Sequence, residues 1–274
     1  MLKLFKIEWS KLLQSRSFRV LLGIYIVVYT LFLLVLSSMF DRFSSDVLNE
    51  VVKNIDYNPF TFPDIWILTA YFAQPFTLLA AIIVIVLVVN EFDFRTARQH
   101  IIDGLTRWEF VLGKFITVVT ISVIVTVLIF LLGSFTGLMK DTGTSPTGYG
   151  ISLSYFIAFF VRTVGLLTFA MFLAMWIKRT GVTILIFIVL HLGLFAAIVR
   201  NRLDATIGDA LPMGTFNRLI RLFRPDDSII QNYEQLKLTD MILIAPTGQF
   251  VVSLIYIAAF VGLSYVVIRR NDLK

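Results

Sequence analysis

Long apolar runs constrain this chain more than any other feature of its sequence. Six runs of roughly 20 residues follow one another, and a helix of that length spans a hydrocarbon core about 30 Å thick. Their approximate bounds are 18–39, 66–89, 115–138, 151–177, 182–199 and 250–268. Because lipid offers no water to satisfy backbone amides, each run should be helical. The sequence predicts an all-α membrane protein with six transmembrane helices.

The composition supports this fold class. Apolar residues make up 58% of the chain and charged residues 15%, against about 25% charged residues in ordinary soluble domains. The chain has no cysteine, which excludes disulfides, thiol nucleophiles and thiolate metal sites. No repeat or soluble-domain boundary is visible, so we expect one transmembrane domain over 1–274. The first run is too long for a signal core, and bulky Met39 and Phe40 stand where cleavage needs small residues.

The distribution of positive charge predicts the orientation. Four inter-span or terminal segments contain 14 of the 24 Lys and Arg residues, namely 1–19, 90–114, 178–180 and 269–274. The other three segments, 40–66, 138–150 and 200–246, contain 9 of them over a longer total stretch. Since cytoplasmic loops retain an excess of Lys and Arg, both termini and segment 90–114 should be cytoplasmic. This orientation explains the net charge of +6 better than a nucleic-acid face does, and we expect no nucleic-acid partner.

The N-terminal segment, about residues 2–17, has the pattern of an amphipathic helix. One side carries Leu2, Phe5, Trp9, Leu12 and Leu13, and the other carries Lys3, Lys6, Ser10, Lys11 and Gln14. A helix of this kind lies in the headgroup plane, with its apolar side toward the membrane lipids and its lysines near anionic headgroups. We therefore predict an interfacial helix, and a partner-binding helix is the alternative.

The external segment 200–246 contains two further patterns. In "FNRLIRLF", Phe216–Phe223, apolar and basic residues alternate at helical spacing, which predicts a second interfacial helix. In "MILIAPTGQFVV", an apolar start is interrupted from Pro246 to Gln249 before the last span. This pattern predicts a re-entrant turn, whose broken backbone must be buried in protein or line a cavity.

Polar residues inside the spans are candidates for a transport path. Pro75 should bend the second span and leave carbonyls for Gln74 or a neighbouring helix to satisfy. Arg162 lies about halfway along the fourth span, where its insertion costs about 2.5 to 3.5 kcal/mol. A hydrated cavity, carbonyls freed near Pro75 or Pro246, or snorkelling can compensate. Gln74 and Arg162 are the candidate path residues, with a structural role for Arg162 left open, and His191 should hydrogen-bond a neighbouring helix.

Segment 90–114, "NEFDFRTARQHIIDGLTRWEFVLGK", is charged although it joins two spans. Asp93 can cap a helix from Phe94 to about Asp103, and Gly104 can supply the left-handed turn that ends it. Thr106 and Glu109 have the spacing of a capping box at the start of the third span. Such a short helix either connects two spans or transmits a push from a cytoplasmic partner into both.

The pattern "NEFxxxTARQxIxxGxTRxxFxxGK" resembles the cytoplasmic loop of type-2 ABC transporter permeases. The family's usual opening is a basic amphipathic helix, and "KIEWSKLLQSRSF" with Glu8 and Lys11 is similar to it. Six spans, cytoplasmic termini and a large external segment before the last span extend the resemblance, in the ABCG-like architecture, over the whole chain.

This resemblance implies the permease subunit of an ATP-driven ABC exporter in the plasma or inner membrane of a bacterium. It would pair with a second permease chain, as a homodimer or heterodimer, and move a lipid-like, peptide or drug-like substrate by alternating access. The helix at about 94–103 would be a coupling helix seated in a cytoplasmic ABC ATPase subunit. The implied coupling positions are Glu91, Arg95, Thr96, Arg98, Gln99, Gly104, Thr106, Arg107, Gly113 and Lys114.

The chain lacks the GxxxxGK[ST] phosphate loop. Gly113 and Lys114 match its GK, but Trp108 stands at the position of the first glycine and Phe115 at that of the Ser or Thr. We therefore expect no cofactor and no enzyme activity in this chain, and we expect ATP and Mg in the partner ATPase. An ion-driven carrier or channel is the alternative, although such proteins usually carry acidic residues at mid-membrane depth. An intramembrane enzyme ranks lower, because His100 and His191 form no HExxH pattern.

Overall fold

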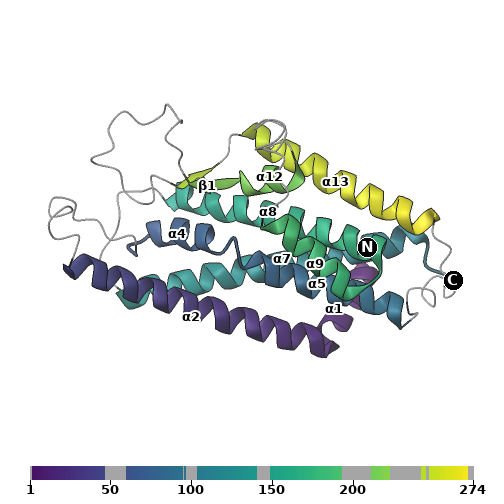
Figure 1. Ribbon diagram of the computed structural model, residues 1–274, viewed down its shortest axis with the longest axis horizontal. Helices are drawn as coiled ribbons and strands as arrows, with labels where there is room; N and C mark the ends of the chain where they lie inside the picture. Colours follow the sequence, from purple (N-terminus) through teal and green to yellow (C-terminus); the bar gives the residue numbers. More distant parts are fainter. Residues whose placement is uncertain are drawn as a thin grey trace.

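The computed structural model describes residues 2–46, 60–94, 96, 104–140, 149–192, 211–222, 242–244 and 247–270. Its elements in chain order are α1 (Leu2–Gln14), α2 (Arg16–Asp46), α4 (Asp64–Phe72), α5 (Thr77–Asp93), α7 (Arg107–Lys140), α8 (Tyr149–Ile177), α9 (Thr180–His191), α12 (Pro212–Asn217), β1 (Ile220–Leu222), β2 (Ile242–Ile244) and α13 (Thr247–Arg270). The long helices run along one axis, and α1 and the C-terminal end of α13 lie at the same end of the bundle (Figure 1).

The helical membrane fold is confirmed. Within the described residues, four helices are long and apolar enough to cross a membrane: Arg16–Met39, Arg107–Lys140, Ser152–Ile177 and Thr247–Arg270. The bent pair of α4 and α5 makes a fifth span if it is counted as one. The run predicted at 182–199 coincides in part with α9, a helix of 12 residues, and its remainder, 193–199, lies outside the described residues. A sixth span therefore stays a prediction.

The second span is broken at Pro75, as predicted. Residues 73–76 form a turn, and α4 and α5 meet there at an angle of 51°. Proline has no backbone N–H to donate, so the regular hydrogen-bond pattern cannot pass through this position. Hydrogen bonds between residues three apart replace the usual bonds between residues four apart. They include Thr77 N to Gln74 O at 3.2 Å and Leu78 N to Pro75 O at 3.2 Å. At the bend the Gln74 carbonyl leaves the regular helical pattern and accepts from the Thr77 N–H at 3.2 Å and the Thr77 hydroxyl at 2.6 Å.

Helix α8 is the centre of the bundle. It packs against α13, α5, α7 and α4. In its most apolar 18-residue stretch 72% of the residues are buried, against 22% in the corresponding stretch of α2. Fully buried side chains such as Phe159, Leu166 and Met171 line this contact. The outer helices instead present large apolar side chains outward, and these include Val27, Leu131 and Ile255. This distribution is what a helix bundle surrounded by lipid requires.

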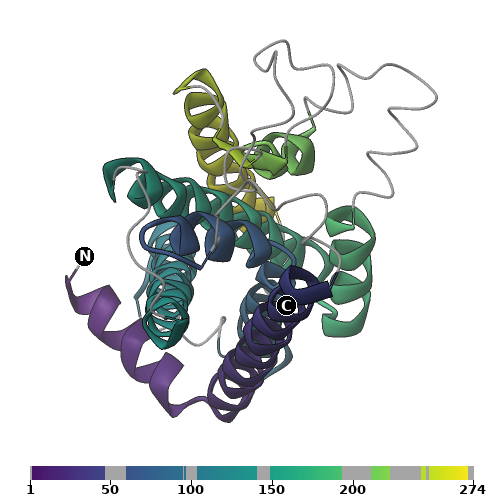
Figure 2. The same cartoon turned by 90° about the vertical axis from the view of Figure 1, so that its left-hand side faces the viewer.

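The predicted N-terminal helix is present as α1. Figure 2 shows α1 running across the view while α2 and α7 are seen nearly end-on, so α1 lies across the end of the bundle. The side packed against the bundle is only partly the predicted apolar stripe, because Leu12 of that stripe is buried together with Glu8. Phe5, Trp9 and Leu13 are exposed, as side chains that reach into a headgroup layer would be.

The helix predicted at Phe216–Phe223 is wrong. Helix α12 ends at Asn217, and Ile220 to Leu222 form strand β1, which pairs antiparallel with β2 in the register Ile220 to Ile244. Phe216 and Ile220 are buried against the bundle rather than exposed to a lipid surface. The residues of β1 fit either structure, so pairing with a distant segment decided the outcome.

The segment before the last span packs into the bundle. Helix α12 contacts both α8 and α13, and Gln249 in the first turn of α13 donates to the Thr215 carbonyl at 3.2 Å. Pro246, the centre of the predicted re-entrant turn, lies outside the described residues. Thr247 to Gln249, predicted as part of the interruption, instead form the first turn of α13, so that part of the prediction is wrong.

We predict that Gly165→Ala lowers the free energy of unfolding by about 1 to 3 kcal/mol, the usual cost of overpacking. A Cβ atom at Gly165 would lie 2.2 Å from the ring of Phe216, which is fully buried. Unfolding in detergent measures the effect, and Phe216→Leu in the same chain should recover part of it. Gly262→Ala on α13 is the matched control, because nothing lies within 4 Å of that position. Equal stability of the two alanine variants would contradict this packing.

Candidate functional site

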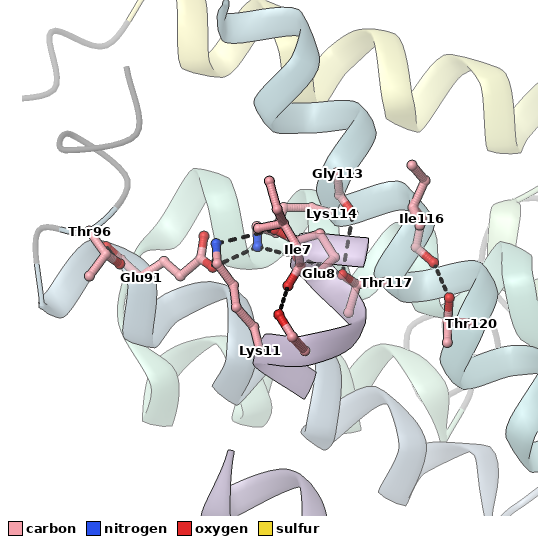
Figure 3. A network of polar contacts seen from close by, with 11 residues as sticks. Ile7, Glu8, Lys11, Glu91, Thr96, Gly113, Lys114, Ile116, Thr117 and Thr120 are labelled. Atoms are coloured by element: carbon pink, nitrogen blue, oxygen red, sulfur yellow. Dashed lines mark hydrogen bonds and ion pairs between the residues drawn. The ribbon is translucent and has the colours of Figure 1, made fainter. Parts of the chain in front are cut away.

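Lys114 is the centre of a buried ionic cluster at the end of the bundle that carries α1 (Figure 3). Its Nζ lies 2.7 Å from Glu8 Oε2 on α1 and 2.6 Å from Glu91 Oε1 near the end of α5. Lys114 itself is on α7 and only 4% exposed. One ammonium group therefore joins three helices that are far apart in the sequence.

Two further side chains complete this cluster, which we call the Lys114 cluster (Glu8, Lys11, Glu91, Lys114 and Thr117). Lys11 Nζ lies 3.3 Å from Glu8 Oε1 and 3.5 Å from Glu91 Oε1. The Thr117 hydroxyl donates to Glu8 Oε2 at 2.8 Å. Two carboxylates thus face two ammonium groups and a hydroxyl, so the charges are balanced where water is scarce.

Glu8 stays ionised in this setting. Burial alone would raise the pKa of Glu8, but the charge and hydrogen bond of Lys114, followed by Lys11 and Thr117, lower it from 4.5 to about 2. The cluster therefore keeps its charge pairing at neutral pH.

The start of α7 is fixed by the predicted capping box. The Thr106 backbone N–H and hydroxyl donate to Glu109 Oε2 at 2.8 and 2.7 Å, and the Glu109 N–H donates to Thr106 Oγ1 at 3.2 Å. Gly104 has a φ of +98°, which confirms the left-handed turn predicted at this residue, before the start of α7. Arg107 then donates to the carbonyls of Ile268 and Arg269, at 3.1 and 2.6 Å, and so ties α7 to the last turn of α13.

The cap predicted at Asp93 is wrong. Asp93 is the last residue of α5, and the Phe94 N–H still bonds to the Asn90 carbonyl at 2.9 Å, so the second span continues four residues beyond its predicted end. Asn90 to Asp93 keep their helical hydrogen bonds, so Asp93 belongs to α5 and does not cap a following helix. The Thr96 hydroxyl donates to the Glu91 carbonyl at 3.2 Å.

The predicted coupling positions are thus only partly visible. Glu91 and Lys114 meet in the Lys114 cluster, and Gly113 lies against Glu8. Thr106 and Arg107 hold the start of α7. Thr96 contacts the end of α5, and Gly104 makes the turn before α7. Arg95, Arg98 and Gln99 lie outside the described residues, as does most of the helix predicted at 94–103.

Arg162 lies inside the bundle, in contact with the bend at Pro75. Its Nη1 donates to the Gln74 carbonyl at 3.3 Å and to Thr77 Oγ1 at 3.1 Å, and its Nη2 donates to Asn217 Oδ1 at 2.8 Å. Of the three ways of compensating this charge, bonding to a carbonyl freed near Pro75 is therefore present. The Gln74 side chain turns the other way and donates to the Ile220 carbonyl at 3.1 Å.

Sequence reasoning did not identify Asn217 and Thr77 as partners of Arg162, or Glu8 as a partner of Lys114. One signal for Glu8 was present, because it stands four residues from both Leu4 and Leu12, on one face of α1. A carboxylate on a packing face needs a buried cation opposite it. Asn217 gave no such signal, because polar residues are ordinary in an external segment.

These features together define a multi-pass membrane permease, with apolar helices around a core that holds a few buried, paired charges. The ABC-2 family transporter protein model matches residues 2–273. The chain therefore belongs to the ABC-2 family of transporter permeases, whose members are membrane subunits of ABC transporters. A comparison with curated proteins gave no match.

We predict that a double-mutant cycle of Glu8→Gln and Lys114→Gln gives a coupling energy of about 1 to 3 kcal/mol, since both groups are buried in one network. The measurement is the free energy of unfolding in detergent for the parent, both single variants and the double variant. The matched control is the cycle of Glu8→Gln with Lys11→Gln. It should give less than about 1 kcal/mol, because the Lys11 side chain is 35% exposed. Similar coupling in both cycles would contradict the central role of Lys114.

We also predict that α1 loosens from α7 in acid. The folded pKa of Glu8, about 2, is below the ordinary 4.5, so its stabilisation is complete above pH 4.5 and is lost as the pH falls toward 2. Spin labels on cysteines placed at exposed Ser10 and Val123 would report the distance between the helices, in a chain with no other cysteine. The distance distribution should broaden between pH 4.5 and 2. In a Glu8→Gln control it should not change over that interval, and an identical response of the two proteins would refute the assignment.

Proposed function

We propose that this chain is the permease subunit of an ATP-driven ABC exporter, working with a second permease chain and a separate cytoplasmic ABC ATPase. The observation that carries the proposal is the Lys114 cluster, in a chain that belongs to the ABC-2 family. This cluster joins α1 to α5 and α7, the two helices that flank the coupling helix predicted at about 94–103 in the sequence.

The proposed coupling works through rigid connections. Helix α5 ends at Asp93 and α7 begins at Arg107, so a push on the segment between them acts on both helices. Lys114 binds Glu91 across that gap and Glu8 on α1, which keeps the three helices together when they move. Separating such buried charges costs about 3 to 5 kcal/mol, so they should move as a unit.

The proposed cycle begins when ATP and Mg bind to the partner ATPase. Closure of the ATPase pair would shift the coupling helices and turn the space between two permeases from one face of the membrane to the other. The partner must bind the two conformations with different affinity, because equal affinity would drive nothing. We infer six spans with 182–199 as the fifth, both termini in the cytoplasm, and a bacterial cell membrane as the location.

The cargo class that we propose is lipid-like, peptide or drug-like. Support for an apolar cargo comes from the aromatic side chains where α4, α7 and α8 meet. The ring centroids of Trp66 and Phe130 lie 4.9 Å apart, and those of Phe130 and Phe156 lie 5.2 Å apart. An ion-driven carrier or channel remains the competing function, since Arg162 is a buried charge beside a cavity.

We predict that Arg98→Glu or Gln99→Ala lowers ATPase activity coupled to transport by about tenfold, equivalent to losing about 1.4 kcal/mol of contact with the ATPase. Both positions are on the predicted coupling helix, so membrane insertion should not change. The assay needs the permease and its ATPase together in proteoliposomes. Arg270→Glu is the matched control, because Arg270 is exposed at the end of α13 on the same side of the bundle. Full coupling in both variants would count against the proposal, and ion flux without nucleotide would favour the carrier or channel.

A further inference from the structure

A cavity of about 540 Å³ lies beside the bend of the second span. Its polar lining consists of Gln74, Arg162, His191 and Asn217. Its apolar lining consists of Tyr71, Phe72, Pro75, Leu78 and Leu192. The volume is within the range of about 300 to 1,000 Å³ that small-molecule sites occupy. Few polar groups converge in a mostly apolar space, which is the composition of a ligand site.

Among the described residues, no anionic side chain pairs with Arg162 in this cavity. Its three acceptors, the Gln74 carbonyl, the Thr77 hydroxyl and the Asn217 amide oxygen, are all neutral. Every ion pair among the described residues belongs to the Lys114 cluster instead. Arg162 is 2% exposed, so its charge is removed from water without a counter-charge. A buried charge in this state attracts an anion strongly.

Two buried nitrogen atoms also lack partners within the described part of the chain. They are Arg162 Nε and His191 Nδ1, and both side chains line the cavity. His191 is 9% exposed. Buried polar atoms are rarely left unsatisfied, because each costs about 1 to 3 kcal/mol. The unpaired charge and the unpaired atoms occur in the same place.

We propose that this cavity binds the anionic head group of an amphipathic molecule, a phosphate or a carboxylate, with Arg162 as its main contact. A guanidinium group can offer two parallel N–H donors to such an anion. Asn217 now accepts from Nη2, and its amide can rotate to donate its NH₂ group to the bound anion. The inference rests on the proposed function, for which it defines the cargo as an amphiphile with a negative head.

The apolar part of the ligand has a surface to lie on. Phe72 and Leu78 line the cavity beside the bend, and Leu192 lines it from the end of α9 and is 63% exposed. An exposed leucine at the edge of a cavity lets an acyl or aromatic tail continue from the site toward the lipid. A free inorganic anion would gain nothing from this lining.

The test is native mass spectrometry of the full chain, purified in detergent without its ATPase. Phosphatidylglycerol is the anionic probe, phosphatidylcholine is the zwitterionic one, and inorganic phosphate is added as a competitor. We expect a preference of about tenfold for phosphatidylglycerol, equivalent to about 1.4 kcal/mol. Arg162→Gln should abolish this preference, while Arg162→Lys should keep part of it. Arg270→Gln, which removes an exposed charge far from the cavity, should leave it unchanged.

Asn217→Asp is the sharper variant, because it keeps Arg162 and the cavity volume. The new carboxylate would take the place of the anion on Nη2, so the preference should disappear without loss of the fold. This variant also covers the case in which Arg162→Gln fails to fold. A preference that persists in Asn217→Asp would overturn the proposal, as would one that persists in folded Arg162→Gln.

The source of the anion is decided by the competitor. Displacement of phosphatidylglycerol by millimolar inorganic phosphate would overturn the amphiphile and assign the site to a free anion. No displacement, with the preference lost in both variants, would support it. Because no ATPase is present, a negative result leaves the coupling proposal standing, and a failed coupling assay leaves this one standing.

Discussion

The bond of one ammonium group to two carboxylates organises one end of this protein. Lys114 is buried on α7, and its charge is acceptable there only because Glu8 and Glu91 meet it at 2.7 and 2.6 Å. The requirement is mutual, since removing any one of the three leaves the charges of the cluster unbalanced where water is scarce. It fixes where α1 docks, and it joins the end of α5 to α7. The capping box at Thr106 and the bonds of Arg107 to the end of α13 hold α7 in the matching position.

A second set of polar contacts organises the interior around the bend. Pro75 breaks the helix and frees the Gln74 carbonyl, to which Arg162 donates from the central helix. The same guanidinium reaches Asn217 and so holds α12 against α8. Gly165 makes this contact possible, because any side chain there would collide with Phe216. A local break in one span is thus satisfied by a residue from the segment before the last span.

Apart from the cap at Asp93, features set by neighbouring residues could be predicted from the sequence, and features set by distant residues could not. Apolar length predicts the helices, Pro75 the bend, Gly104 the turn, and Thr106 with Glu109 the cap, because each depends on chemistry within a few residues. The contact of Lys114 with Glu8 joins residues 106 positions apart, and that of Arg162 with Asn217 joins residues 55 apart. Strand β1 was missed for the same reason. Its partner β2 is distant in the sequence, so no local pattern indicates the pairing. The sequence showed that placing Arg162 inside a span costs free energy. It did not show the partners of Arg162, because these depend on how α12 packs against α8.

Helix α5 connects the two polar sites. Glu91 in the Lys114 cluster stands near its last turn, and Thr77, which accepts from Arg162, begins it. The 17 residues of α5 span about 25 Å at a rise of about 1.5 Å per residue. A continuous helix of that length shifts as one body, whereas the bend at residues 73–76 can absorb a change of angle relative to α4. Movement imposed at Glu91 would therefore displace the contacts of Arg162 with Thr77 and Gln74. An anion bound to Arg162 would oppose or favour that movement according to its affinity for the conformation before and after the movement.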